Sequence, residues 1–450
     1  MKNIFVLAMD DFQREEMNTL RNVENYRFHN VLDVATLVEA ESIDFDELLA
    51  ACRKEIRAAD VPVDAIVAHW DFPTSVLAPI LCEEFGVPSP GLESVLKCEH
   101  KYWSRLEQQK AVPEVVPEFC HFDPFDDHAI DKIPLAFPFW IKPVKAFSSQ
   151  LGFRIESREQ FLESQAIIRQ EIGRIGNAFD QILRRVQLPE ELAGTSGCSC
   201  LAEQIISGEQ VAPEGSVCKG EFSVHGIFDM GRGRDGTSIE SLIYPSQLPD
   251  KVQQQLVDVS ERLMRQIGFD NGCFNVEFMW DKANDKLWLI EINSRISQSH
   301  SEMFILVNGM SNHEVAIDVA LGGGEGLPEK AGSYSVAAKF ILTRAEDGLV
   351  RRVPGPGEIE ALARRFPHTR LKLEVEPGMA LNQVPNQDAY SFVLGELYLG
   401  AENRNALMAR YQDCLDALTF DIVPLTDQEP ASPGGEHEDR RPVSLSGENH

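Results

Sequence analysis

The sequence lacks the cysteine patterns and the long apolar runs that mark several large classes of protein. Its nine cysteines are scattered, none forms a CxxC pair, and Cys198 and Cys200 alone are too close together to build a zinc site. No stretch approaches the ~20 apolar residues of a membrane span. The apolar run Ile4–Met9 is too short for the core of a secretory signal. We therefore expect a cytoplasmic protein with reduced thiols and no membrane partner.

Positive charge is also scarce in this chain. It has 42 Lys and Arg residues against 71 Asp and Glu residues, which gives a formal net charge of −29 at pH 7. This balance argues against wrapping nucleic acid or docking on anionic lipid, so we expect no nucleic-acid partner. The 450 residues suffice for about three domains. A hydrophobic share of 43% and a charged share of 25% are ordinary for globular proteins and exclude general disorder and coiled coil.

The first part of the chain alternates between strand and helix patterns. Ile4–Met9 predicts a buried parallel strand followed by a helix through Leu20, and Ala65–Ala68 predicts a second strand before a helix over Thr74–Phe85. This alternation predicts a small Rossmann-like α/β domain over residues 1–96. The segment has no GxGxxG motif, which argues against nucleotide binding by this unit alone.

The middle of the chain also mixes helices and strands, so the fold class expected overall is α/β with α+β parts. The predicted elements are a helix at Cys98–Gln109, a strand at Phe137–Pro143, a long helix at Ser157–Val186, strands at Leu201–Ile206 and Glu221–Asp229, and a helix at Leu248–Ile267. Residues 331–425 alternate again and predict a C-terminal α+β unit. Residues 426–450 are polar and rich in Pro, Gly and Ser, and they are expected to be disordered.

A predicted β-hairpin carries the most informative polar pattern. Its strands are Gly272–Trp280 and Lys286–Asn293, joined by a turn over Asp281–Asp285. Strand alternation places Asn275 and Glu277 on one face of the first strand. It likewise places Glu291 and Asn293 together on one face of the partner strand.

Two carboxylates and an amide from adjacent strands form a site of hard oxygen ligands. Mg²⁺ takes one or two carboxylates together with phosphates and waters, so we expect Glu277, Glu291 and Asn293 to bind Mg²⁺, with Mn²⁺ as an alternative. Arg295 follows closely and adds a planar cation for a phosphate or a carboxylate. The other interpretation is an exposed ribbon with a wet polar face.

Two lysines strengthen the phosphate interpretation. Lys142 ends an apolar strand and precedes a stretch with Ser148, Ser149 and Gly152, which suits a loop whose amides cover phosphates. GxxxxGK[ST] is absent, so this is not a P-loop. Lys101 lies on the helix over Cys98–Gln109, and by itself it has the pattern of a surface lysine.

Taken in order, these motifs resemble the ATP-grasp superfamily over roughly residues 1–425. The resemblance implies a front α/β domain at 1–96, an ATP-grasp domain at 97–330 with its lid at about 132–206, and the C-terminal unit at 331–425. It also implies a role for each motif residue. Lys101, with Lys97 as the alternative, would contact the nucleotide, and Lys142, Ser148 and Ser149 would contact its phosphates. Glu203 and the backbone of Gln204, Ile205 and Ile206 would contact the adenine, and Glu209 would contact the ribose. Glu277, Glu291 and Asn293 would bind the magnesium, and Arg295 with Lys142 would contact the reacting phosphoryl group.

The closest resemblance within the superfamily is to the biotin-carboxylase-like branch. Biotin carboxylases follow Glu-x-Asn-x-Arg with a glutamate base four residues after the arginine, whereas Ser299 stands there in this chain. A hydroxyl cannot serve as that base unaided, and the chain has no Ala-Met-Lys-Met segment. The resemblance therefore favours a ligase that activates a small carboxylic acid with ATP, giving an acyl phosphate that an amine attacks.

Two rival functions stay open at this stage: a bicarbonate-using enzyme and an ATP-binding module without turnover. His300 has two readings as well, because it either lines the acceptor pocket or is a buried structural histidine. A homodimer is a further possibility that the sequence leaves open.

Overall fold

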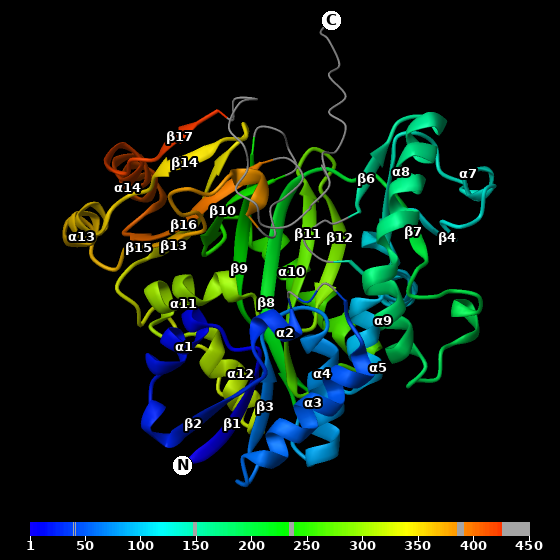
Figure 1. The fold of residues 1–450 in the computed structure, drawn as a ribbon, viewed down its shortest axis with the longest axis horizontal. Helices are drawn as coiled ribbons and strands as arrows, with labels where there is room; N and C mark the ends of the chain where they lie inside the picture. Colours follow the sequence, from blue (N-terminus) through cyan, green and yellow to red (C-terminus); the bar gives the residue numbers. More distant parts are fainter. Residues whose placement is uncertain (39, 41, 147–150, 234–237, 385–390, 425–450) are drawn as a thin grey trace, which may run out of the picture.

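The computed structural model describes residues 1–424 except 39, 41, 147–150, 234–237 and 385–390 (Figure 1). The predicted tail at 426–450 and the two loop serines, Ser148 and Ser149, therefore lie outside the described residues. Within the described part the strands form four sheets, which confirms the mixed helix and sheet fold class. No helix in this part of the chain is both long and apolar enough to cross a membrane.

The front domain is built on a three-stranded parallel sheet of order β2-β1-β3. The apolar runs of β1 and β3 are buried on both faces, as parallel strands are when helices cover them, whereas β2, at the sheet edge, is mixed in polarity and only partly buried. The predicted bounds of β3 and α4 agree with the structure. The elements are β1 (Lys2–Leu7), α1 (Asp11–Asn18), η1 (Val23–Asn25), β2 (Tyr26–Val31), α2 (Val34–Leu37), α3 (Phe45–Ala58), β3 (Ala65–Ala68) and α4 (Thr74–Phe85).

The predicted helix at Cys98–Gln109 is two helices, α5 (Leu92–Glu99) and α6 (Lys101–Ala111). The chain breaks at His100, whose backbone is extended and whose Nδ1 accepts a 3.1 Å hydrogen bond from the Trp103 amide. A histidine that caps a helix in this way does not interrupt the apolar periodicity, so the sequence pattern predicted one helix through His100. The break makes Lys101 the first residue of α6.

The lid is a second small sheet, antiparallel and of order β4-β7-β5-β6. The long helix expected at Ser157–Val186 is divided at Ile172 into α8, which packs on this sheet, and α9, which packs on the front domain near Phe72. The lid region comprises η2 (Pro113–Val115), β4 (Phe119–Phe122), α7 (Ala129–Lys132), β5 (Phe139–Pro143), β6 (Phe153–Ile155), α8 (Arg158–Glu171), α9 (Gly173–Leu183), η3 (Glu190–Leu192) and β7 (Cys200–Gln204).

The largest sheet has eight strands in the order β12-β11-β8-β9-β10-β13-β16-β15, and every neighbouring pair is antiparallel. α10 packs against β8 and β9, while α11 contacts β10, β13 and β16 (Figure 1). The elements are β8 (Glu209–Cys218), β9 (Glu221–Arg232), β10 (Ile239–Tyr244), α10 (Asp250–Ile267), β11 (Gly272–Asp281), β12 (Lys286–Asn293), η4 (Gln298–His300), α11 (Ser301–Asn308), α12 (Asn312–Ala320), β13 (Val336–Arg344), β15 (Arg370–Leu373) and β16 (Phe392–Ala401).

The remaining C-terminal elements surround the far end of this sheet. β14 and β17 form a separate two-stranded sheet, and α14 packs on β13 and β16. The predicted boundary at residue 330 stays a prediction, and β13 pairs directly with β10 across it. These elements are β14 (Leu349–Arg352), α13 (Pro356–Arg365), η5 (Leu381–Gln383), α14 (Arg404–Ala417) and β17 (Asp421–Val423).

The predicted hairpin of β11 and β12 is confirmed, with one irregularity. Glu277 pairs with Glu291, but the next pair is Phe278 with Leu289, so Ile290 is an extra residue that bulges out of the ladder. Glu277 and Glu291 are therefore direct cross-strand neighbours because of the bulge, since a regular ladder would pair Glu277 with Ile290.

We predict that Gly208→Ala disturbs the connection between β7 and β8. Gly208 has φ of +147°, and a Cβ there would run into the carbonyl group of Trp280. The substitution should lower the free energy of unfolding by about 2 kcal/mol, measured by denaturant unfolding. Gly357→Ala in α13 is the matched control, because a Cβ there meets open space; equal stability of the two variants would contradict this account.

Candidate active site

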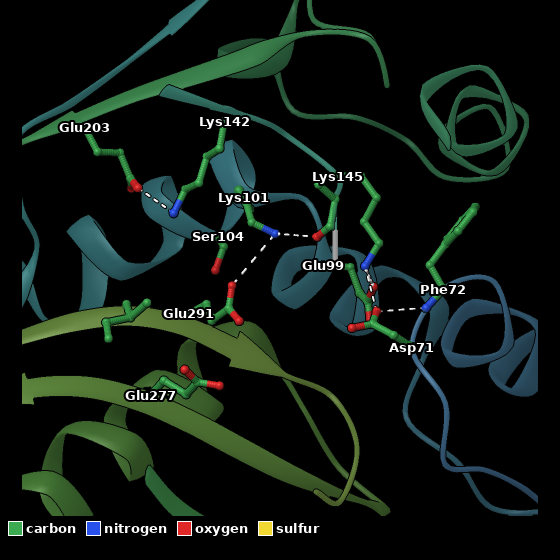
Figure 2. A network of polar contacts seen from close by, with 12 residues as sticks. Asp71, Phe72, Glu99, Lys101, Ser104, Lys142, Lys145, Glu203, Glu277 and Glu291 are labelled. Atoms are coloured by element: carbon green, nitrogen blue, oxygen red, sulfur yellow. Dashed lines mark hydrogen bonds and ion pairs between the residues drawn. The ribbon is translucent and has the colours of Figure 1, made fainter. Parts of the chain in front are cut away.

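Two glutamates on the hairpin form the acidic wall of the site (Figure 2). Glu277 is partly buried and accepts a 2.8 Å hydrogen bond from Gln210 Nε2. Burial and the charge of Glu291 raise the pKa of Glu277 to about 7 from its ordinary value of 4.5. A cation between the two carboxylates would relieve this repulsion.

The donor set fits a magnesium ion. Asn293, the third predicted ligand, lies on β12 two residues beyond Glu291, and its cross-strand partner is Asn275. The described residues hold no group of three or more His, Cys, Asp or Glu side chains that could bind a metal. Two carboxylates and an amide suit Mg²⁺, which completes its shell with phosphate oxygens and water.

Lys101 faces this acidic wall from the start of α6. Its Nζ donates a 2.9 Å hydrogen bond to the Ala146 carbonyl and lies 3.8 Å from Glu291 Oε2 (Figure 2). Lys97 instead pairs with Glu93 on its own helix at 2.7 Å. The geometry therefore favours Lys101 over Lys97 as the cation beside the carboxylates.

Lys142, at the end of β5, is held by Glu203 on β7. Its Nζ lies 2.6 Å from Glu203 Oε2, and Arg105 Nε lies 2.5 Å from the other oxygen. Burial raises the pKa of Glu203, but Arg105 and Lys142 outweigh that effect and lower it to about 2. Both oxygens of this carboxylate thus serve to position cations, and a contact of Glu203 with adenine stays a prediction.

Arg105 is a residue that sequence reasoning missed. It is 2% exposed, and its Nη1 and Nη2 each donate a 2.9 Å hydrogen bond to the carbonyls of Leu289 and Ile290. These carbonyls belong to the β12 bulge directly before Glu291. No sequence pattern marked Arg105, because its neighbours on the buried side of α6 are mostly polar, among them Ser104, Glu107 and Gln108.

The front domain contributes a further cluster of charged side chains, centred on Asp71, which the sequence analysis did not single out. Lys145 is 4% exposed, and its Nζ lies 2.9 Å from Asp71 Oδ1 and also contacts Glu99 (Figure 2). Burial lowers the pKa of Lys145, yet Asp71 and Glu99 raise it above its usual range. The available signal was the position of Asp71 just beyond the carboxyl end of a parallel strand, where sites of α/β sheets gather.

Arg295 reaches the same group from the end of β12. Its Nη2 lies 3.3 Å from Asp71 Oδ2, and its Nη1 donates a 3.2 Å hydrogen bond to the Ile296 carbonyl. Burial raises the pKa of Asp71, but Lys145 and Arg295 hold it well below its usual range. The structure thus brings Lys101, Lys142 and Arg295 to one site with Glu277 and Glu291.

Comparison with known protein families agrees with this arrangement. Residues 135–302 match the model of the ATP-grasp domain. Residues 135–302 are an ATP-grasp domain. This match spans most of the predicted lid and the hairpin of β11 and β12, so the predicted ATP-grasp resemblance is confirmed.

Two relatives show the extent of ATP-grasp similarity in sequence. The protein y4rH of Sinorhizobium fredii is 24% identical over 354 residues, which are 77% of this chain and 66% of that protein. The carbamoyl phosphate synthase large chain of Haemophilus ducreyi is 28% identical over 146 residues, 28% of this chain. The second match spans 13% of that large chain.

Solved structures show the ATP-grasp fold over nearly the whole chain. L-amino acid ligase from Bacillus licheniformis superposes with a TM-score of 0.69 at 16% identity and covers 95% of this chain and 99% of its own. Biotin carboxylase from Campylobacter jejuni has a TM-score of 0.63 at 17% identity, with coverages of 94% and 92%. The ATP-grasp fold class is thereby confirmed.

The remaining predicted nucleotide contacts lie at the connection from lid to core. Gln204 ends β7, Ile205 and Ile206 follow it half-buried, and Glu209 begins β8 with an exposed side chain. They border the strand that carries Glu203. Their adenine and ribose contacts stay a prediction.

The residues after Arg295 are engaged within the protein. Ser299 Oγ accepts a 2.9 Å hydrogen bond from Lys339 Nζ. His300 is 2% exposed, its Nδ1 lies 2.7 Å from Glu214 Oε2, and its ring stacks on Phe228. The structure therefore supports the structural reading of His300.

We predict that Mg²⁺ binds this site less tightly as the pH falls through 7. A proton on Glu277, whose pKa is raised to about 7, competes with the cation, so affinity should drop by up to about tenfold per pH unit below that value. Calorimetric titration of Mg²⁺ with a non-hydrolysable ATP analogue, between about pH 6 and pH 8, measures this.

The metal-free protein should show the opposite trend in stability. The folded state keeps a proton on Glu277 between pH 4.5 and about 7, where the unfolded state has lost it. That contribution is present at low pH and is lost as the pH rises through about 7. Glu277→Gln should remove both pH effects; an unchanged pH profile in this variant would show that another group is responsible.

Proposed function

We propose that the protein is an ATP-dependent, ADP-forming carboxylate–amine ligase. It activates a small carboxylic acid, an amino acid or a related metabolite, as an acyl phosphate that an amine then attacks. The observation that carries the proposal is the meeting of Lys101, Lys142 and Arg295 with the Glu277–Glu291 pair at one site of an ATP-grasp domain. The similarity in fold to an L-amino acid ligase over almost the whole chain supports it.

The cations of the site fit the charge of the nucleotide. Lys142 comes from the lid, Lys101 from the start of α6, and Arg295 from the end of β12, so positive charge surrounds the phosphates from three directions. Such fixed cations stabilise negative charge that builds on phosphoryl oxygens during transfer. When bound, Mg²⁺ held by Glu277, Glu291 and Asn293 supplies further neutralisation. Of the similar structures, a 2-oxoglutarate carboxylase domain carries MgADP.

The surroundings of Ser299 favour an organic acid over bicarbonate. The position that holds a glutamate base in biotin carboxylases is here a hydroxyl that accepts from Lys339. A hydroxyl bonded to a cation removes no proton from bicarbonate, whereas an organic carboxylate arrives already ionised at pH 7. We therefore propose an organic acid and an amine as the substrates.

The homodimer and the cytoplasmic location that the sequence leads us to expect stay predictions. The 2-oxoglutarate carboxylase domain with the same fold, at a TM-score of 0.61, is a dimer.

We predict ADP release that requires an acid together with an amine and that ignores bicarbonate and free biotin. The measurement is a coupled ADP assay over pairs of amino acids, with mass spectrometry of the products.

Arg295→Ala should lower the rate by roughly 10²–10³, the usual loss for one donor to a developing anion. Glu291→Ala should abolish turnover and leave the fold intact, because the side chain is partly exposed on the sheet face.

The control for both variants is Glu221→Gln, an exposed glutamate at the start of β9. It should keep the rate of the unmodified protein. ADP release that requires bicarbonate and ignores every amine would overturn the ligase proposal, and near-normal activity of Glu291→Ala would overturn the metal assignment.

A further inference from the structure

Gln210 on β8 contacts the proposed metal ligand Glu277 from the neighbouring strand. It is 4% exposed, and its Nε2 donates the 2.8 Å hydrogen bond to Glu277 Oε2. β8 lies between β9 and β11 in the large sheet, so Gln210 can reach partners on both sides. Its direct cross-strand partners are Met230 and Met279, which are apolar. A polar amide is therefore buried beside apolar side chains, where only its hydrogen bonds offset the cost of burial.

The oxygen of the Gln210 amide is held by Arg232, the last residue of β9. Arg232 Nε donates a 2.9 Å hydrogen bond to Gln210 Oε1, and its Nη2 also contacts this oxygen. A guanidinium carries only donors, so the amide atom beside it has to be the oxygen. The amide nitrogen then faces the opposite side, toward Glu277. Arg232 thus decides which way the amide points.

The amide fixes the Glu277 side chain against the repulsion of Glu291. The two carboxylates are direct cross-strand neighbours, and like charges in that position repel. Gln210 donates to Oε2 of Glu277, while no protein group among the described residues donates to Oε1. Glu291 has a different neighbour, Lys101, whose Nζ lies 3.8 Å from its Oε2 (Figure 2). The protein itself therefore holds the Glu277 carboxylate in one orientation.

We propose that Gln210 and Arg232 are positioning residues that make the Glu277–Glu291 site selective for Mg²⁺ over Ca²⁺. The proposal rests on the proposed function, because it takes this pair of glutamates as the metal site of an ATP-dependent ligase. Mg²⁺ requires nearly ideal octahedral geometry, whereas Ca²⁺ accepts about six to eight ligands in flexible arrangements. A carboxylate held in one orientation therefore favours the smaller ion, and a carboxylate that is free to turn loses that preference.

Packing alone does not explain this pair of residues. An apolar side chain of the same length, as in the neighbours Met230 and Met279, would fill the position of Gln210 without needing partners. Arg232 is exposed, so it fills no space in the core. The hydrogen bonds of Gln210 therefore act on the orientation of Glu277. Partners that orient a metal ligand typically change metal affinity by about 10- to 100-fold.

The test compares binding of Mg²⁺ with binding of Ca²⁺ in the presence of a non-hydrolysable ATP analogue, measured by calorimetry without turnover. Gln210→Met keeps the length of the side chain and removes both of its hydrogen bonds. It should weaken Mg²⁺ binding by about 10- to 100-fold and change Ca²⁺ binding by less than about threefold. The preference for Mg²⁺ over Ca²⁺ should therefore fall by at least about threefold.

Variants of Arg232 provide a second test that leaves the core untouched. Arg232→Met should lower the preference for Mg²⁺ by about threefold, since Gln210 still donates to Glu277 but its amide can turn. Arg232→Lys keeps a charged donor for Gln210 Oε1 and should restore most of the preference. The matched control is Arg352→Met, because Arg352 is likewise the last residue of a strand, β14, and its side chain is 50% exposed. It should bind both ions as the unmodified protein does.

The outcomes separate this proposal from the ligase proposal. A lost Mg²⁺ preference in Gln210→Met and Arg232→Met, without ADP release for any acid and amine, would support the positioning role and overturn the ligase. ADP release by the unmodified protein, with an unchanged preference in both variants, would overturn the positioning role alone. Equal weakening of Mg²⁺ and Ca²⁺ would also overturn it, because that result would show a general loosening of the site. If Gln210→Met does not fold, the Arg232 variants decide the question.

Discussion

The buried ion pair between Arg105 and Glu203 is the contact on which the geometry of the site depends. Glu203 uses its second oxygen to fix Lys142 of the lid, and Arg105 uses its remaining donors to fix the β12 bulge directly before Glu291. One side chain of α6 therefore sets the distance between Lys142 and Glu291, the residues proposed to bind phosphate and metal. Removing Glu203 would leave the buried Arg105 without a counter-charge, at a cost of about 3–5 kcal/mol.

Local sequence patterns predicted the parts of the site that lie on one continuous element. The hairpin could be predicted because strand alternation and a short turn decide which residues of a strand share a face. The direct pairing of Glu277 with Glu291 depends on the bulge at Ile290, which alternation does not reveal. β3 and α4 were predicted with correct bounds because an apolar run ends at turn residues. The break at His100 was missed, since its cause is a side-chain cap that leaves the apolar pattern intact.

The rest of the site depends on contacts between distant segments, which no local pattern reveals. Arg105 and Glu203 are 98 residues apart, and Lys145 is 74 residues from Asp71. All four side chains are charged, and Arg105, Glu203 and Lys145 are also buried, although single-sequence reasoning assigns charged residues to the surface. β8 was also missed, because Pro213 and Gly215 interrupt its apolar run, although it occupies the middle of the largest sheet.

The eight-stranded sheet makes the catalytic core and the C-terminal unit inseparable in folding. β13 completes the hydrogen bonds of β10, so a chain cut before β13 would expose an unpaired strand edge that invites aggregation. The two parts should therefore melt in a single cooperative transition. Because the sheet is continuous through β10 and β13, the C-terminal unit is not a module that could be exchanged without repairing a strand edge.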